Sequence, residues 1–245
     1  MLTSHFWSGD ALRSRTVSPI VLTQTLDVPA PPARLLADWE RETSKHVLLD
    51  PGDVEPMPLA RALMRWPDYS RCVRIVADWT RAQGLTDVLA TSDIALMACR
   101  GARYHHDGAQ YGSAAFCNLF MSEDKGLDLH FPALDLRIPL TRGTAVVFDT
   151  GQPHGVIRRG SSGFSAADFA AHEDRIQIFL TWELAIEDAA VASTLGVTFD
   201  VDPAASPEPD EEQLRLDGER VEVCSETGQW LRAHASTSRP SPPVS

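Results

Sequence analysis

The sequence predicts an α+β protein in which N-terminal helices support an antiparallel β-sandwich, compatible with a jelly roll (double-stranded β-helix). Two patterns predict this fold. Before about residue 90, apolar residues recur at helical spacing, whereas from Ile94 onward short segments alternate between polar and apolar residues. Glycines separate these short segments, as turns between antiparallel strands do, at Gly101, Gly108, Gly126, Gly143, Gly151 and Gly160.

The N-terminal part carries one strand signal and three helix signals. Residues 18–28 are apolar, β-branched and bounded by prolines, which predicts a strand. A helix is expected over 33–40, directly after two prolines, and a shorter one over 59–66, which Pro67 ends. A third is expected between Asp68 and Gly84, with one apolar face. We expect these helices to cover one face of the sheet.

The whole chain is interpreted as a single domain with appendages. Its helical part spans about 1–90, and the jelly-roll core spans about 91–187. An extension over about 188–234 contains a predicted hairpin around Asp217-Gly218. The tail, 235–245, is rich in proline and serine and is predicted to be disordered.

Composition restricts the partners. The net charge is −12, from 34 acidic and 22 basic residues, and a surface of that sign repels nucleic acid. No apolar run is long enough to cross a membrane, and no signal peptide is recognisable. The four cysteines form no Cys-x-x-Cys pair, which favours free thiols in a reducing cytoplasm. We therefore expect a cytoplasmic protein that binds neither nucleic acid nor membranes; its oligomeric state is not indicated.

Three residues form a candidate metal site. His105 and Asp107 are two positions apart, so on an extended strand both side chains point to the same side. His154 follows after enough chain for two or three strands to return it to the pair. Two imidazoles and one carboxylate leave one side of a metal open, as in non-heme Fe(II) sites, whereas a closed zinc site would have four protein ligands.

The region around these residues, roughly 94 to 184, resembles the Fe(II)- and 2-oxoglutarate-dependent dioxygenases. The order of motifs carries the resemblance: a His-x-Asp pair, a strand pair with a glycine turn, a Phe-Asp-x…His stretch, and a strand that begins with arginine. These elements are found at 105–107, 115–121, 127–132, 137–149, His154 and 175–182. The resemblance implies that Fe(II), 2-oxoglutarate and O2 are used to hydroxylate a small organic substrate, such as an amino acid or another metabolite. Asp107 favours hydroxylation, since the related halogenases lack this carboxylate.

The resemblance also implies residues that bind the co-substrate. Arg175 would hold the distal carboxylate of 2-oxoglutarate through a bidentate fork. Gln177 lies on the same strand face, although many family members have a small polar residue there, and Asn118 is a further candidate contact. Arg158 and Arg159 are nearer to His154 in the sequence, but they lead into a Gly-Ser turn and are interpreted as solvated.

Substrate contacts are expected from residues around the pair and from a long loop. Tyr104 and Tyr111 flank the His-x-Asp pair, although core packing explains them equally well. The loop from Gly160 to Asp174 is expected above the metal, where Phe164 and Phe169 would cover a ligand or simply pin the loop to the sheet.

Two other functions fit the same residues less well. One is a protein or peptide side-chain hydroxylase of the same fold. The other is a non-catalytic, cupin-like binding module, but cupins present His-x-His with a following Glu, which this sequence lacks. Conversion of 2-oxoglutarate to succinate separates the enzyme from the module.

Overall fold

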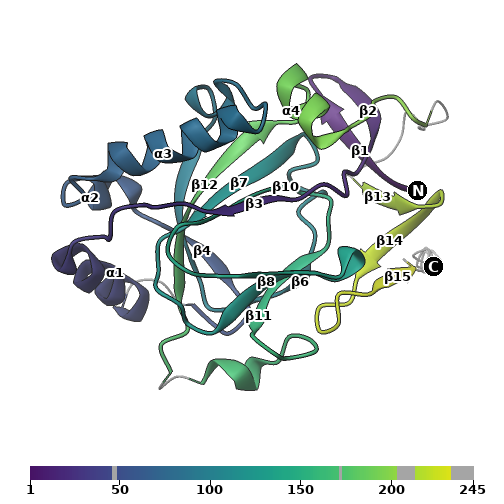
Figure 1. Ribbon diagram of the computed structural model, residues 1–245. Coiled ribbons are helices and arrows are strands. Elements are labelled where there is room, and N and C mark those ends of the chain that lie inside the picture. The colour runs from purple at the N-terminus through teal and green to yellow at the C-terminus, as the bar shows by residue number, and fades with distance from the viewer. Residues whose placement is uncertain (46–48, 171–172, 203–212, 233–245) are drawn as a thin grey trace, which may run out of the picture.

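A computed structural model describes residues 1–45, 49–170, 173–202 and 213–232 (Figure 1). Its centre consists of two antiparallel sheets that face each other. The larger sheet has the strand order β3-β10-β7-β12-β5-β4, and the smaller has β6-β11-β8-β9. The larger sheet comprises β3 (Leu22–Thr25), β4 (Val54–Met57), β5 (Ile94–Cys99), β7 (Ala114–Phe120), β10 (Thr144–Asp149) and β12 (Gln177–Ala185). The smaller comprises β6 (Ala102–His105), β8 (Leu127–Phe131), β9 (Leu136–Pro139) and β11 (His154–Arg158).

The chain passes repeatedly between these two sheets. Strands β5, β7, β10 and β12 belong to the larger sheet, and β6, β8, β9 and β11 to the smaller one. The space between the sheets is filled with aromatic and aliphatic side chains, among them Phe120, Phe131, Phe148 and Phe179. This inner core fixes the positions of the strands that carry the predicted metal ligands.

Helices cover the outer face of the larger sheet (Figure 1). They are α1 (Ala33–Lys45), α2 (Leu59–Leu63), α3 (Tyr69–Ala82) and, further along the chain, α4 (Ala189–Leu195). Trp39 of α1 and Trp79 of α3 are buried in one cluster with Leu180 and Trp182 of β12. The expected helices are therefore present, and the second ends earlier than expected, at Leu63.

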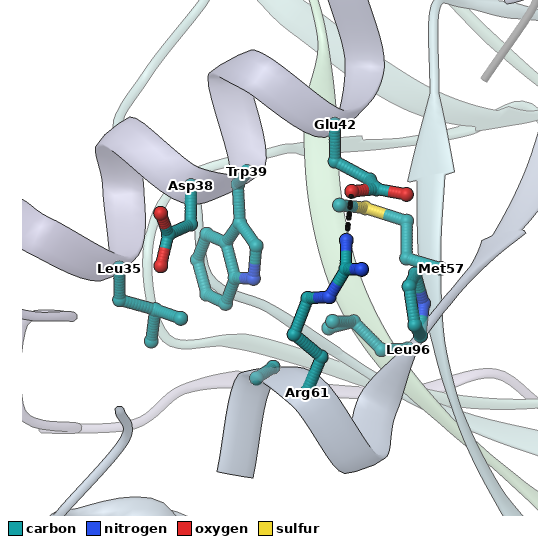
Figure 2. A pocket seen from close by; sticks show the side chains of 9 residues that line it. Leu35, Asp38, Trp39, Glu42, Met57, Arg61 and Leu96 are labelled. Carbon is teal, nitrogen blue, oxygen red and sulfur yellow. Dashed lines mark hydrogen bonds and ion pairs between the residues drawn. The ribbon is translucent and has the colours of Figure 1, made fainter. Parts of the chain in front are cut away.

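A narrow cleft lies between α1 and α2 (Figure 2). The indole of Trp39 forms part of its wall, and an ion pair between Glu42 and Arg61 lies across it at 2.8 Å. The neighbouring Asp38 is paired with both Arg41 and Arg65. The acidic side chains of this cleft therefore all have cationic partners.

A third sheet joins the two ends of the chain, with the order β15-β14-β13-β1-β2. It comprises β1 (Leu2–Ser8), β2 (Ala11–Thr16), β13 (Gln213–Leu216), β14 (Glu219–Val223) and β15 (Trp230–Arg232). The expected hairpin is present: Asp217 and Gly218 both have positive φ, which a two-residue type I′ turn requires. The first hairpin, β1–β2, was not expected within the helical N-terminal part. The predicted disordered tail lies outside the described residues.

The described part of the chain contains no helix that is long and apolar enough to cross a bilayer. Its four cysteines are free. Cys72, Cys99 and Cys117 are buried, and burial raises the pKa of each thiol, of Cys72 to about 11. These three cysteines are packing residues rather than nucleophiles.

Candidate metal centre

The three predicted ligands meet at one edge of the smaller sheet. His105 is the last residue of β6 and His154 is the first residue of β11, and the two are directly opposite each other in this antiparallel pair. Asp107 follows β6 after one residue. Residues that face each other across a strand pair lie on the same side of the sheet, so strand register brings both imidazoles together.

The ligand atoms are close enough to share one ion. The Nε2 atom of His105 is 3.6 Å from Oδ1 of Asp107, and Nε2 of His154 is 3.5 Å from Oδ2 of the same carboxylate. The potential ligand atoms of the three residues all lie within 4.8 Å of one another. The geometry therefore fits a divalent ion bound by two imidazoles and one carboxylate.

Backbone carbonyls set the orientation of both imidazoles. Nδ1 of His105 is 2.6 Å from the carbonyl oxygen of Arg103, and Nδ1 of His154 is 2.9 Å from that of Gln152. A carbonyl only accepts hydrogen bonds, so each Nδ1 carries the proton and donates it. This leaves the lone pair of each Nε2 available for a metal.

His154 is the buried member of the set, with a side chain 9% exposed, compared with 22% for Asp107 and 39% for His105. The rings of Phe148 and Phe131 lie 4.8 and 5.9 Å from its imidazole. Burial, together with the neighbouring His105, lowers the pKa of His154 to about 4. The imidazole is thus neutral near pH 7, as a metal ligand must be.

The turn between β10 and β11 positions two of the three ligands. The carbonyl oxygen of Thr150 accepts a 2.8 Å hydrogen bond from the backbone N–H of Asp107. Asp149, fully buried, accepts hydrogen bonds from the backbone N–H groups of Gly151 and Ser18. Its carboxylate also forms a bidentate ion pair with the equally buried guanidinium of Arg15, at 2.6 and 3.0 Å. Strand β2 is thereby attached to the metal-binding turn.

Tyr104 does not face the metal site, which corrects its predicted role as a substrate contact. It adjoins His105 on β6, so alternation directs its side chain to the opposite face of the sheet. There it is buried, its hydroxyl lies 2.5 Å from Nδ1 of His130, and Gly228 of the C-terminal extension packs against its ring. His130 belongs to this second, structural pair.

Tyr111 lies on the metal side. Its ring packs edge-on against Phe116 at 5.2 Å. Burial raises the pKa of its phenol, and the negative charges of Glu183 and Asp107 raise it further. The hydroxyl is therefore within electrostatic range of the metal-binding carboxylate, and Tyr111 stays a predicted substrate contact.

Asn118 and Gln177 both lie in the interior between the sheets. Each has a side-chain oxygen without a hydrogen-bond partner, and Gln177 is fully buried. The rings of Phe120 and Phe179, tilted by 31° with centres 5.1 Å apart, occupy the level between them. Asn118 is thus the nearer of the two to the metal end, and both stay predicted co-substrate contacts.

Arg175 does not open a strand as expected, because β12 begins at Gln177. Its Nε donates to Glu173 at 2.5 Å, and its Nη1 lies 3.3 Å from the carbonyl oxygen of Lys125. One nitrogen of this guanidinium is thus already paired with an acid. Its role as the co-substrate anchor stays a prediction.

Arg158 and Arg159 are more than a solvated turn. Arg158 contacts Asp168, and Arg159 binds both Asp124 and Asp128 at 2.9 Å. The bonds with these two carboxylates raise the pKa of Arg159 above its ordinary value. Both arginines fasten the end of β11 to neighbouring chain, so neither is free for a ligand.

Arg103 is a cation that the sequence interpretation missed. It precedes His105 by two residues on β6, in a segment where the register with β11 shifts between His154 and Val156. Its guanidinium lies 5.4 Å from the ring centre of Phe164 and makes no ion pair or hydrogen bond with any residue that the structure describes.

Two buried phenylalanines attach the loop after β11 to the sheet. Phe164 and Phe169 are buried and stack at 5.5 Å. Phe169 lies under Gly101, where a Cβ would be 2.4 Å from its ring, and Phe164 packs against Gly52. The interpretation of these phenylalanines as anchors of the loop therefore describes their packing, and the position of the loop above the candidate metal site stays a prediction.

Phe169→Ala is therefore expected to lower the free energy of unfolding by about 3–5 kcal/mol, since a buried aromatic ring leaves a cavity under Gly101. Urea denaturation measures this loss. Leu63→Ala, at a side chain that is 40% exposed, serves as the control and should change stability little. A small effect of Phe169→Ala, comparable to the control, would show that the loop is not held by this ring.

No family model matches the sequence, and no curated protein matches it significantly. Among solved structures, the chain is similar to a viral collagen prolyl hydroxylase from Paramecium Bursaria Chlorella virus-1, at 9% identity and TM-score 0.40, over 67% of this chain and 90% of that one. It is also similar to EvdO2 from Micromonospora carbonacea var. aurantiaca, at 14% identity and TM-score 0.43, over 77% and 90%. A third likeness is to the epimerase SnoN in complex with Fe3+, alpha ketoglutarate and nogalamycin RO, at 11% identity and TM-score 0.37, over 77% and 88%. At these TM-scores the likeness carries no weight for function, which must be argued from the residues of this chain.

Proposed function

We propose that the protein is a non-heme Fe(II) oxygenase that couples the decarboxylation of 2-oxoglutarate to the hydroxylation of a small organic molecule. The observation that carries the proposal is the convergence of Nε2 of His105, Nε2 of His154 and the carboxylate of Asp107 within 4.8 Å. Two histidines and one carboxylate are the ligand set of non-heme Fe(II) oxygenases. The set binds one side of the metal and leaves positions open on the other.

The passage of successive strands from one sheet to the other supports a double-stranded β-helix as the scaffold. Strands β5 to β12 contribute four to each of the two facing sheets, and all their pairings are antiparallel. In such a fold the ends of β6 and β11 lie side by side at one opening of the barrel. We propose that this opening admits the substrate.

The residues around the site prepare it for a metal. The carbonyl groups of Arg103 and Gln152 hold each imidazole with Nε2 available, and burial keeps His154 neutral. Phe131 and Phe148 exclude water from one side of His154. When bound, Fe(II) together with 2-oxoglutarate and O2 supplies the oxidising chemistry, and succinate and carbon dioxide are released. The free thiols accord with a reducing cytoplasm, where Fe(II) is maintained.

The test is iron-dependent conversion of 2-oxoglutarate to succinate by the purified protein. A slow conversion is expected even without the substrate, and removal of iron with a chelator should abolish it. Iron binding at one ion per chain should accompany the activity. Failure to bind Fe(II), or succinate formation that is indifferent to the chelator, would overturn the proposal.

The co-substrate anchor has two candidates, Arg175 from the sequence and Arg103 from the structure. Arg103 has no acidic partner to exchange among the described residues, and it lies on β6 two residues before the candidate ligand His105. Arg103→Ala is therefore expected to weaken the binding of 2-oxoglutarate to the metal-loaded protein by about 10- to 100-fold, as the loss of a charged hydrogen bond does. Calorimetric titration measures the affinity, and Arg103→Lys should recover only part of it.

Arg158→Ala and Arg159→Ala are the controls, because acidic residues already bind both side chains. We expect a smaller effect from Arg175→Ala than from Arg103→Ala. The opposite order of effects would return the anchor to Arg175.

A further inference from the structure

We infer that the substrate carries a positively charged amino group, which Glu183 binds at the opening of the barrel against the rings of Tyr111 and Phe116. The inference rests on the proposed function, because it names the substrate class of the same site. It follows from a row of side chains on the inner face of the larger sheet.

Glu183 lies in that row at a distance suited to a small substrate. It is opposite Phe116 of β7, and Phe116 is opposite Phe148 of β10. Paired residues share a face, so all three side chains point toward the interior, whereas Trp182 and Leu184 pack on the helix side. Phe148 contacts His154, with ring centres 4.8 Å apart. With strands spaced about 4.8 Å, the backbone of Glu183 lies about 10 Å from that of Phe148, two strands away on the same sheet.

The carboxylate of Glu183 is uncompensated. It is exposed, and it makes no hydrogen bond or ion pair with the residues that the structure describes. Partial burial raises the pKa of Glu183, and the negative charge of its neighbour Asp93 raises it further. The acids of the α1–α2 cleft differ in this respect, because Asp38 and Glu42 are paired with arginines. A cation is therefore the complementary ligand for Glu183.

The aromatic residues beside Glu183 favour the same ligand. Tyr111 and Phe116 meet edge to face at 5.2 Å, and Phe116 meets Phe148 at 6.1 Å. Aromatic faces attract ammonium groups, most strongly where water is partly excluded. Together with the carboxylate they form two walls, one charged and one aromatic.

An unsatisfied acceptor lies one level deeper. Asn118 is 7% exposed and lies between Val146 and Thr181 on the same inner face as Phe116. Its Oδ1 has no hydrogen-bond partner. A buried carbonyl oxygen without a donor is costly, and a ligand N–H group would satisfy it. This buried acceptor is independent of the Glu183 charge.

The experiment measures the binding of three matched probes to the metal-free protein by ligand-observed NMR: benzylamine as the cation, benzyl alcohol as the neutral analogue and benzoate as the anion. Benzylamine is expected to bind about tenfold more tightly than benzyl alcohol, with benzoate the weakest. Glu183→Gln should remove the preference for the cation. Glu40→Gln, which neutralises an exposed acid on α1, should preserve it.

A second measurement does not depend on a variant. Raising the salt concentration to about 0.5 M should weaken benzylamine binding to the native protein and leave benzyl alcohol unaffected, since salt screens exposed charge pairs. Equal affinity for the amine and the alcohol, or a preference that survives in Glu183→Gln, overturns the inference. Because these measurements need no iron, they are separate from the succinate assay: iron-dependent succinate formation without a cation preference overturns only the inference about the substrate.

Discussion

Asp107→Ala is expected to abolish turnover and to weaken iron binding by more than about 100-fold. Its carboxylate supplies the single anionic ligand, lying 3.5 and 3.6 Å from the two Nε2 atoms. Without it, only two neutral imidazoles would bind the divalent cation, and no negatively charged ligand would offset the charge of the metal. Since even hydrogen-bond partners of metal ligands change affinity by about 10- to 100-fold, loss of a ligand should exceed that range.

Two assays separate binding from chemistry in this variant. Metal content after dialysis reports affinity, and succinate formation at saturating Fe(II) reports activity. Even when excess Fe(II) restores metal binding, the variant should form no succinate. Asp27→Ala, at an exposed acid without side-chain bonds in the described structure, should match the native protein in both assays. Full iron affinity in Asp107→Ala would mean that the metal, if bound, is held elsewhere.

Arg15→Ala is expected to lower the free energy of unfolding by about 3–5 kcal/mol. Arg15 and Asp149 are both fully buried, and truncating the arginine leaves a buried carboxylate without its cation. The effect should extend to function, because Asp149 organises the turn whose Thr150 carbonyl holds Asp107. We therefore expect weaker iron binding as well as lower stability.

Strand β2 offers a matched control two residues away. Arg13 has the same orientation along the strand, and its ion pairs with Glu187 and Asp200 lie at the surface. Arg13→Ala should cost no more than about 1 kcal/mol. Urea unfolding measures both variants. A double variant, Arg15→Met with Asp149→Asn, should be more stable than Arg15→Ala, because no buried charge is left unpaired. Equal effects of Arg13→Ala and Arg15→Ala would show that the buried pair has no special weight.

Local sequence patterns were sufficient for the helices and for the metal set. Apolar spacing predicted the helices that become α1 and α3, because the residues of the buried face of a helix recur every three to four positions in the sequence. Asp107 and His105 lie together because they are two residues apart. His154 required a turn that brings the chain back, and its motif predicted that return.

The same alternation would have placed two residues that were misassigned or missed. Tyr104 adjoins the candidate ligand His105 and so faces away from it. Glu183 lies on the inner face of β12 because Trp182 and Leu184 are needed in the core. The sequence shows which residues of a strand share a face. Only the structure shows which of the two faces points to the interior.

The sequence by itself determined which reactive side chains this protein contains and which of them are neighbours along a strand or helix. Tertiary structure alone decided which distant groups became partners: Arg15 with Asp149, and Phe169 with Gly101. These pairings join segments far apart in the chain or depend on how a loop returns to the sheet. Contacts of that kind arise from packing and charge pairing over the whole core, so no local periodicity records them.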